Sequence, residues 1–368
     1  MSDPIPNRPI RVLSIDDSAF FRKVLTEILG HHADIDLVGC ASDAYEARDQ
    51  LLSTQVDVLT LDIEMPRMAG LTFLKLIMER KPMPVIVLSC QTPPGSPKAV
   101  EALIAGAFNV IEKPVNLSNK RDFGEKLIRD IKTAAAAPKR HRFPTMLTNC
   151  LKTQRFGMPK APPVPQYDPR QIIALGASTG GTQALEEVLS MLPANLPGIV
   201  AVQHIPADFS TSFAVRLNQV CAMEVREAAD GDRVCPGLAL IAPGDRHMDI
   251  HWARDHYYVH LHDGPRVEHQ RPSVDVLFES LAHSAGPHTV ATLLTGMGRD
   301  GAAGMKRLHD LDAYTIAQDA DSSVVYGMAR QAVELHAVKS IVSLEKIAGE
   351  IVKALETQNQ RATVKTHE

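Results

Sequence analysis

Short apolar runs alternate with stretches of helical periodicity through the first third of the chain. A buried strand reads as a short apolar run, whereas a surface helix repeats its apolar positions every three to four residues. Strands that alternate with helices in this way form a parallel sheet covered by helices on both faces. The predicted strands are Arg11–Ile15, Ile35–Cys40, Val56–Leu61, Pro84–Leu88 and Ala107–Ile111.

The same alternation begins again at Ile172 and predicts a second, mostly parallel sheet. Helical patterns follow most of its runs, including Asp275–Ala285 and Val324–Leu335. The segment Met248–His262 alternates apolar and polar residues, which is typical of an inserted β-hairpin. The predicted strands of this sheet are Ile172–Leu175, Ile199–Val202, Ala239–Ile241, Thr289–Leu294, Thr315–Ala317 and Ser340–Val342.

Between residues 134 and 171 neither pattern is present, because an alanine run gives way to basic residues and scattered prolines. Such a segment is typical of a linker between domains. We therefore expect two doubly wound α/β domains, a flavodoxin-like one at residues 8–133 and a Rossmann-like one at residues 172–357. The polar residues 358–368 are expected to form a disordered tail.

Composition changes this picture little. The chain has 368 residues, 45% of them apolar and 22% charged, which suits a globular protein of two domains. Its formal charge of -4 argues against a surface for nucleic acid or anionic membranes. Its start lacks the pattern of a signal peptide and no apolar run could span a bilayer, so we expect a cytoplasmic location. The five cysteines have no paired spacing and are expected to be reduced thiols.

Polar side chains collect just after the strands of the first domain, where functional groups gather in an open parallel sheet. Asp16, Asp17 and Asp62 would bring together three carboxylates, which suits Mg²⁺. Ser89 and Lys113 would add a hydroxyl donor and a positive charge for a phosphoryl group. Each aspartate taken alone could be a helix N-cap. Their joint placement at successive strand ends favours a site for magnesium and phosphate.

Four motifs lie around these residues: Ile15-Asp16-Asp17-Ser18, Leu61–Met68, Leu88-Ser89 and Glu112–Val115. In order and spacing they resemble the motifs of a two-component receiver domain, and the resemblance covers about residues 8–133. It implies that a partner histidine kinase phosphorylates Asp62. It also implies that Asp16 and Asp17 hold Mg²⁺ together with Asp62.

The receiver resemblance implies further details beyond the acidic residues. Ser89 would bind the phosphoryl group, Lys113 would pair with it, and the bond between Lys113 and Pro114 would be cis. Two residues depart from the receiver pattern. Ala69 stands where the family usually has aspartate, and Val110 stands where many receivers have an aromatic switch residue.

A glycine-rich segment, Gly176–Gly181, lies between an apolar run and a helical pattern in the second domain. Glycines at such a turn let Ser178 project its hydroxyl beyond the sheet edge, toward helix N–H groups that favour negative charge. This position suits a serine nucleophile. A phosphate-binding loop or a simple tight turn would also explain the six residues.

Reactive side chains follow two other predicted strands, where His204 and Asp300 occur. An imidazole that accepts the serine proton, and a buried carboxylate that orients the imidazole, would make Ser178 nucleophilic. Glycines on both sides of Met297 would let its amide approach a ligand closely as an oxyanion donor. The chain order Ser, His, Asp differs from that of α/β hydrolases and argues against that fold, but not against the mechanism.

Five segments of the second domain are Gly176–Gly181, Gln203–Pro206, Ile241–Gly244, Arg271–Asp275 and Leu294–Gly301. Together they are similar to the catalytic domain of the chemotaxis protein-glutamate methylesterases, and with the receiver in front the similarity spans about residues 8–355. It implies that Ser178 is the nucleophile, His204 the general base and acid, Asp300 the orienting carboxylate and Met297 the backbone oxyanion donor.

The implied activity is hydrolysis of glutamate γ-methyl esters on the cytoplasmic helices of chemoreceptors, with deamidation of receptor glutamines as a second activity. Phosphorylation of the receiver at Asp62 would activate the esterase, and the ester chemistry itself would need no cofactor. Asp245 departs from the family, which has a glycine at this point of an Ala-Pro-Gly-Gly stretch.

Simpler interpretations stay open. His247 is a second histidine candidate for the pocket, and Asp300 alone could cap a helix over Gly301–Leu311. The second domain could be a non-catalytic binding module regulated by the receiver. A DNA-binding response regulator is disfavoured, because the chain is acidic and no basic recognition helix follows the linker.

Overall fold

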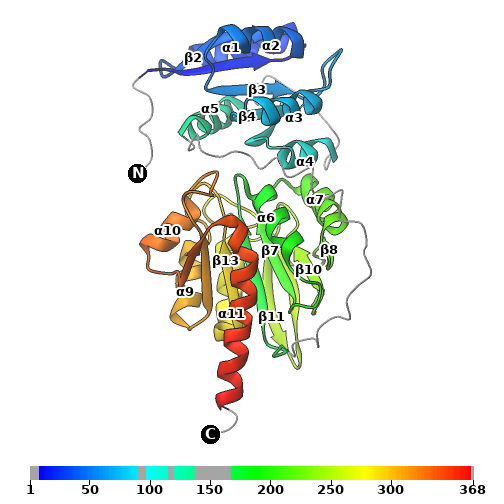
Figure 1. The fold of residues 1–368 in the computed structure, drawn as a ribbon, viewed down its shortest axis with the longest axis vertical. Coiled ribbons are helices and arrows are strands. Elements are labelled where there is room, and N and C mark those ends of the chain that lie inside the picture. The colour runs from blue at the N-terminus through cyan, green and yellow to red at the C-terminus, as the bar shows by residue number, and fades with distance from the viewer. Residues whose placement is uncertain (1–7, 90–96, 115–119, 137–166, 366–368) are drawn as a thin grey trace. The chain divides into compact units, whose positions relative to one another are not determined.

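The computed structural model describes residues 8–89, 97–114, 120–136 and 167–365. The chain divides into two compact units between residues 148 and 149, and each unit is an α/β domain (Figure 1). This division falls inside the expected linker at residues 134–171. Residues 137–166 of that linker lie outside the described residues, and residues 134–136 belong to the last helix of the first unit.

The first unit contains a five-stranded parallel sheet in the order β2-β1-β3-β4-β5, the flavodoxin-like order that was expected. All five predicted strands are present, with ends shifted by at most two residues. The strands are β1 (Ile10–Ile15), β2 (Ile35–Ala41), β3 (Val58–Asp62), β4 (Val85–Ser89) and β5 (Asn109–Glu112). The helices are α1 (Ala19–Gly30), α2 (Ala44–Ser53), α3 (Gly70–Arg80), α4 (Pro97–Ile104) and α5 (Lys120–Ala136).

Side chains cap the first two helices of this unit but not the third. Ser18 caps α1 by accepting a hydrogen bond from the N–H of Phe21, and the side chain of Asp43 caps α2 in the same manner. The residue before α3 is Ala69, which has no side-chain acceptor. The departure from the receiver pattern at this position therefore leaves α3 without a side-chain cap.

The second unit is built on a seven-stranded parallel sheet in the order β15-β14-β13-β6-β7-β10-β8. The chain leaves β6 toward β7, β10 and β8, and later returns to β13 on the other side of β6. Ligands of doubly wound sheets bind at such a reversal, outside the carboxyl ends of the strands. The strands are β6 (Ile172–Ala177), β7 (Ile199–Gln203), β8 (Glu224–Glu227), β10 (Leu238–Ile241), β13 (Thr289–Leu293), β14 (Tyr314–Gln318) and β15 (Ser340–Val342).

Hydrophobic patterning finds every strand of this sheet except β8. That strand reads Glu-Val-Arg-Glu and has one apolar residue, so it carries no strand signal of its own. The predicted hairpin is confirmed as β11 (His247–Ala253) and β12 (His256–His262), an antiparallel pair. With β9 (Arg233–Val234) it forms a separate three-stranded sheet.

Helices α6 (Gly181–Met191), α7 (Ala207–Val220), α8 (Val274–Ser284), α9 (Ala302–Asp310), α10 (Met328–Glu334) and α11 (Leu344–Lys365) complete the second unit. The start of α10 corrects the prediction of a helix from Val324. Val325 instead pairs with the loop after β13, because its carbonyl accepts from Gly296 N and its N–H donates to Thr295 Oγ1.

The expectation of a disordered tail at residues 358–368 is wrong for residues 358–365, which continue α11 (Figure 1). The polar side chain of Gln358 explains why this turn is ordered. It donates to the carbonyl oxygens of Pro287 and Thr289 and accepts a hydrogen bond from Gln171. Residues 366–368 lie outside the described residues.

The core of the second unit joins the two sheets and the helices on them. Phe278 of α8 is fully buried against it, as are Met248 and Ile250 of the hairpin. None of the helices in the described ranges is long and apolar enough to cross a bilayer. The described cysteines Cys40, Cys221 and Cys235 are not in disulfide bonds. Cys90 and Cys150 lie outside the described residues.

Candidate active site and acidic pocket

The serine loop joins β6 to α6 and is fixed on both sides of Ser178. The N–H of Ser178 donates to Thr295 O at 3.0 Å, and its carbonyl accepts from Gly181 N at 2.8 Å. Gly180 takes the left-handed backbone conformation, with φ of 76°, and serves as the N-cap of α6. Ser178 is not among the described residues with positive φ. Glycine is therefore required two residues after the serine, and the serine backbone itself is unstrained.

Gln203 connects the serine loop to the neighbouring loop after β7. Its Nε2 donates to the carbonyl of Ser178 at 2.8 Å and to that of His204 at 3.1 Å. The N–H of His204 donates to Ala177 O, which aligns the ends of β6 and β7. Sequence reasoning did not assign a role to Gln203, although a polar residue ending a buried strand, directly before the candidate histidine, was an available signal.

His204 and Asp300 form the central contact of the site, with 2.6 Å between His204 Nε2 and Asp300 Oδ2. Both side chains are buried, with exposed fractions of 5% and 2%. His204 Nδ1 is also buried and has no hydrogen-bond partner among the described residues. With the proton on Nε2 donated to Asp300, the lone pair of Nδ1 is left to accept a proton.

The Asp300 carboxylate receives three more hydrogen bonds, all from the start of α8. The donors are Ser273 Oγ at 2.7 Å, Val274 N at 2.7 Å and Asp275 N at 3.0 Å. Burial alone would raise the pKa of Asp300, but these donors and His204 hold it below its usual value. Asp300 is therefore a carboxylate that caps a helix, but the helix is α8 and not α9, which follows it in sequence.

The loop after β13 lies directly against the serine. A Cβ added at Gly296 would come within 2.7 Å of Ser178 Cβ, so only glycine allows this approach. The carbonyl of Gly296 accepts from the N–H groups of Gly327 and Met328, which fixes the peptide that leads into Met297. Ser178, His204 and the Met297–Asp300 loop thus come together at the ends of β6, β7 and β13.

Thr295 ties this loop to the serine loop. Its Oγ1 donates to Thr179 O at 2.9 Å and accepts from Val325 N at 2.9 Å. His247, the second histidine candidate, is not part of this cluster. It is buried on β11, its Nε2 contacts Pro265 O at 3.0 Å, and burial lowers its pKa.

In the first unit, the sheet edge gathers the acidic residues as expected. Carboxylate oxygens of Asp16, Asp17 and Asp62 all lie within 4.8 Å of one another, a spacing that one cation could bridge. Lys113 Nζ lies 2.6 Å from Asp16 and 2.7 Å from Asp62. Ser89 ends β4 at the same edge and is buried.

Burial and charge work against each other in this acidic pocket. Burial raises the pKa of Asp62, although Lys113 opposes the shift. Burial also disfavours the charged form of Lys113, but Asp16 and Asp62 outweigh it and raise the pKa of Lys113. Three oxygen-bearing acidic groups at one point suit a hard cation such as Mg²⁺.

Comparison with known proteins finds relatives of each unit and of the whole chain. Family models match both units: CheB methylesterase over residues 173–351 and response regulator receiver domain over residues 12–122. A solved structure, the CheB methylesterase catalytic domain of Thermotoga maritima, has 34% identity and a TM-score of 0.49, covering 50% of this chain and 97% of that one. The protein-glutamate methylesterase/protein-glutamine glutaminase 2 of Syntrophus aciditrophicus is 46% identical over 94% of this chain and 98% of its own length. The protein-glutamate methylesterase/protein-glutamine glutaminase of Salmonella typhimurium is 43% identical over 93% of this chain and 96% of its own length. The chain belongs to the CheB methylesterase family.

The structure explains how the chain accommodates its departures from the family. Asp245 stands in the place of a glycine and adopts a left-handed conformation, with φ of 59°. Aspartate tolerates this conformation better than most residues, because its short side chain bonds locally. Here Asp245 Oδ1 accepts from Arg266 at 2.7 Å and from Arg271 at 3.1 Å. Val110, the departure from the aromatic switch residue of many receivers, is buried on β5.

One expectation from the receiver resemblance is wrong. Within the described ranges, the cis peptide bond is the one between Arg271 and Pro272, so the bond between Lys113 and Pro114 is trans. The trans form is the favoured state of an X–Pro bond, by about 0.5–1 kcal/mol. Lys113 reaches both carboxylates with this bond in the trans form.

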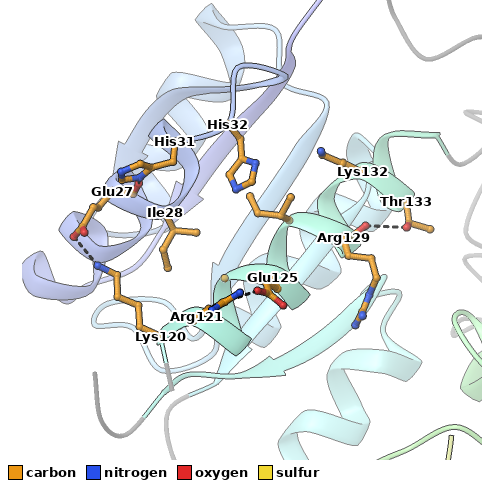
Figure 2. A pocket seen from close by; sticks show the side chains of 12 residues that line it. Glu27, Ile28, His31, His32, Lys120, Arg121, Glu125, Arg129, Lys132 and Thr133 are labelled. Atoms are coloured by element: carbon orange, nitrogen blue, oxygen red, sulfur yellow. Dashed lines mark hydrogen bonds and ion pairs between the residues drawn. The ribbon is translucent and has the colours of Figure 1, made fainter. Parts of the chain in front are cut away.

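A groove of about 850 Å³ lies between α1 and α5 of the first unit (Figure 2). Its rim carries charged side chains that pair with each other, Lys120 with Glu27 and Arg121 with Glu125. None of the acidic-pocket residues lines it, so it is separate from the site at the sheet edge.

Proposed function

We propose that this chain hydrolyses glutamate γ-methyl esters on the cytoplasmic helices of chemoreceptors, releasing methanol, and that it also deamidates receptor glutamines. The relatives that match over nine-tenths of the chain carry both activities in their names. The observation that carries the mechanism is the buried contact between His204 Nε2 and Asp300 beside Ser178. We further propose that the protein acts in the cytoplasm, where those helices are accessible.

Acylation uses the free nitrogen of His204. Ser178 Oγ attacks the ester carbonyl carbon while its proton passes to His204 Nδ1, and a bond forms between Oγ and the carbon. Asp300 stabilises the resulting imidazolium through Nε2. The bond from carbon to the methoxy oxygen then breaks, and that oxygen leaves as methanol with the proton from His204. For a glutamine substrate, the same step releases ammonia.

Deacylation repeats the sequence with water. His204 accepts a proton from water as the hydroxyl attacks the acyl carbon, and Ser178 leaves with the proton returned to it. In both steps the carbonyl oxygen becomes negative. The Met297 N–H, on the loop packed against Ser178, is the proposed donor to this oxyanion, and such donors contribute a few kcal/mol to lowering the barrier, typically about 3.

The first unit regulates this reaction. A phosphohistidine of a partner kinase donates its phosphoryl group to Asp62, so that a P–N bond breaks and a P–O bond forms. Asp16, Asp17 and Asp62 would hold Mg²⁺, which supplies charge neutralisation at the phosphoryl oxygens. Lys113 and Ser89 bind those oxygens directly. The phosphorylated receiver shifts the population of the whole chain toward the active form.

The test of this function is methanol release from receptor membranes methylated with a radiolabelled methyl group. We expect Ser178→Ala to abolish release while phosphorylation at Asp62 continues. Thr179→Ser serves as the matched control, because it changes the next residue of the same loop and leaves the nucleophile in place. Undiminished release by Ser178→Ala would refute the nucleophile assignment.

A further inference from the structure

Asp275 lies at the start of α8, next to the residues that hold Asp300. Its backbone N–H donates to Asp300 Oδ1, as described above. Its side chain reaches a different helix: Asp275 Oδ1 accepts from Gly304 N, in the first turn of α9, at 2.7 Å. Asp275 is therefore a residue of α8 whose side chain bonds to the backbone of α9.

A carboxylate from each of these two segments bonds to the start of the other helix, in addition to the Ser273 side chain that caps α8. Asp300 directly precedes Gly301, and its carboxylate satisfies N–H groups at the start of α8. Asp275 comes from α8, and its carboxylate accepts from the N–H of Gly304 at the start of α9. Gly301 is the N-cap of α9, and its φ is 87°. It has no side chain that could accept a hydrogen bond from the N–H groups of α9. Each helix N-terminus thus faces the carboxylate of the other, which the positive end of a helix favours.

These hydrogen bonds between the starts of α8 and α9 fix the position of Asp300 along α8. Packing alone brings the helices together, since a Cβ at Gly304 would lie 2.7 Å from Phe278 Cβ. Packing does not choose which N–H groups of α8 meet the Asp300 carboxylate. The bond from Gly304 N to Asp275 Oδ1 selects these groups, because it anchors the chain on the C-terminal side of Asp300.

The anchor is maintained against an electrostatic penalty. Burial, followed by the negative charge of Asp300, raises the pKa of Asp275 to about 6, and the N–H of Gly304 only partly offsets this. Asp275 reaches solvent through a groove of about 990 Å³ between α8 and the hairpin. The other charged or titratable groups around Asp275 and its groove are Asp249, His251, Tyr258, His262, Glu268, Glu279 and His283, with Arg299 beside Asp300.

We propose that Asp275 is a positioning residue for the His204–Asp300 pair. Its carboxylate ties the start of α9 to the start of α8 and thereby holds Asp300 where both His204 and the α8 N–H groups reach it. This inference rests on the proposed function, because the role of the pair in hydrolysis is part of that proposal.

Three full-length variants separate positioning from general damage. Asp275→Ala removes the acceptor for Gly304 N. We expect kcat to fall about tenfold at pH 8, as for one lost hydrogen bond to a charged group, with KM unchanged. Asp275→Asn keeps one oxygen for Gly304 but loses the charge, and we expect a fall of about threefold. Glu279→Gln removes a carboxylate one turn along the same helix and groove, and it leaves kcat unchanged. Circular dichroism checks that all three are folded.

The pH dependence gives a readout that a merely structural role would not move. The ratio of wild-type kcat to Asp275→Asn kcat is measured from pH 8 to pH 5, so that pH effects common to both proteins cancel. We expect the ratio to shrink toward one as the pH falls through about 6, because wild-type Asp275 then becomes neutral like asparagine. A ratio of one at pH 8, or a ratio that does not change with pH, would overturn the proposal.

A second readout needs no substrate, so a failure of the proposed function would not conceal the result. With ¹⁵N-labelled histidine, the downfield proton of His204 Nε2 reports its hydrogen bond to Asp300 in the resting protein. We expect wild type and Glu279→Gln to share this signal and Asp275→Ala to shift or broaden it. An unchanged signal in Asp275→Ala would mean that Asp300 is positioned without Asp275.

Discussion

A single hydroxyl, that of Thr295, holds three segments of the active site together. It donates to the serine loop at Thr179 and accepts from Val325, while the Thr295 carbonyl accepts from Ser178. Thr295 is fully buried, so water cannot replace these bonds. A buried polar group that loses its partner costs more than the hydrogen bond was worth.

We therefore expect Thr295→Val, which keeps the shape of the side chain, to lower the free energy of unfolding by about 1–3 kcal/mol. The rate of methanol release should fall as well, because Ser178 loses part of its support. Urea unfolding and the methanol assay measure the two effects. Thr295→Ser retains the hydroxyl and is the matched control; if valine and serine behaved alike in both assays, the hydroxyl would have no such role.

Asp275 carries a prediction about stability that is independent of catalysis. Its pKa in the folded chain is about 6, above the value of about 3.9 for an unfolded aspartate, so the folded state binds more protons between these values. Its contribution to stability is therefore present at low pH and is lost as the pH rises from about 4 to about 6.

The Asp275→Asn variant has no ionisable group at this position. We expect the stability of this variant relative to wild type to rise across that pH window, by on the order of 1–2 kcal/mol once solvent screening is allowed for. Urea unfolding at a series of pH values measures the difference. A constant difference, or one that falls with rising pH, would contradict the raised pKa. A variant that is more stable but slower would identify Asp275 as a residue kept for function.

At the scale of elements, α3 is the helix whose start can be improved. Its N-cap position is occupied by Ala69, which cannot accept from the first N–H groups. We expect Ala69→Asp to stabilise the first unit by about 1 kcal/mol, since N-cap substitutions of this kind change stability by about 0.5–2 kcal/mol. Thermal unfolding of the full chain measures the shift. Ala69→Leu, which cannot cap, should give no gain, and an equal gain from leucine would rule out capping as the cause.

Local patterning predicted the elements well where one segment contains its own signal. The strands before Ser178, His204 and Asp300 are short buried runs, and the polar residue after each could be recognised without the structure. The hydrogen bonds that Gln203 and Thr295 make to the serine loop could not be predicted, because that loop is distant in sequence, in the case of Thr295 by more than a hundred residues. The start of α10 and the end of α11 were predicted wrongly for the same reason, since long-range hydrogen bonds decide where α10 begins and how far α11 extends.

At the scale of the whole molecule, two units carry two chemistries that have no residues in common. The acidic pocket at the end of β3 is the proposed phosphoryl acceptor, and the cluster at the ends of β6, β7 and β13 is the proposed site of ester hydrolysis. A phosphoryl group on Asp62 can change the esterase rate only by favouring one population of the chain over another. The coupling is therefore measurable as a ratio of rates within one variant.

We expect a small-molecule phosphodonor to raise methanol release by the wild-type chain by on the order of tenfold, within the usual range of coupling between sites. Asp62→Asn should give a ratio of one, because no phosphoryl acceptor remains. Removal of Mg²⁺ with a chelator should also abolish the rise, because Asp16, Asp17 and Asp62 would then lack their cation, whereas the rate without phosphodonor should stay the same. A chelator that stops release in the absence of phosphodonor would instead show that the ester chemistry at Ser178 depends on a metal.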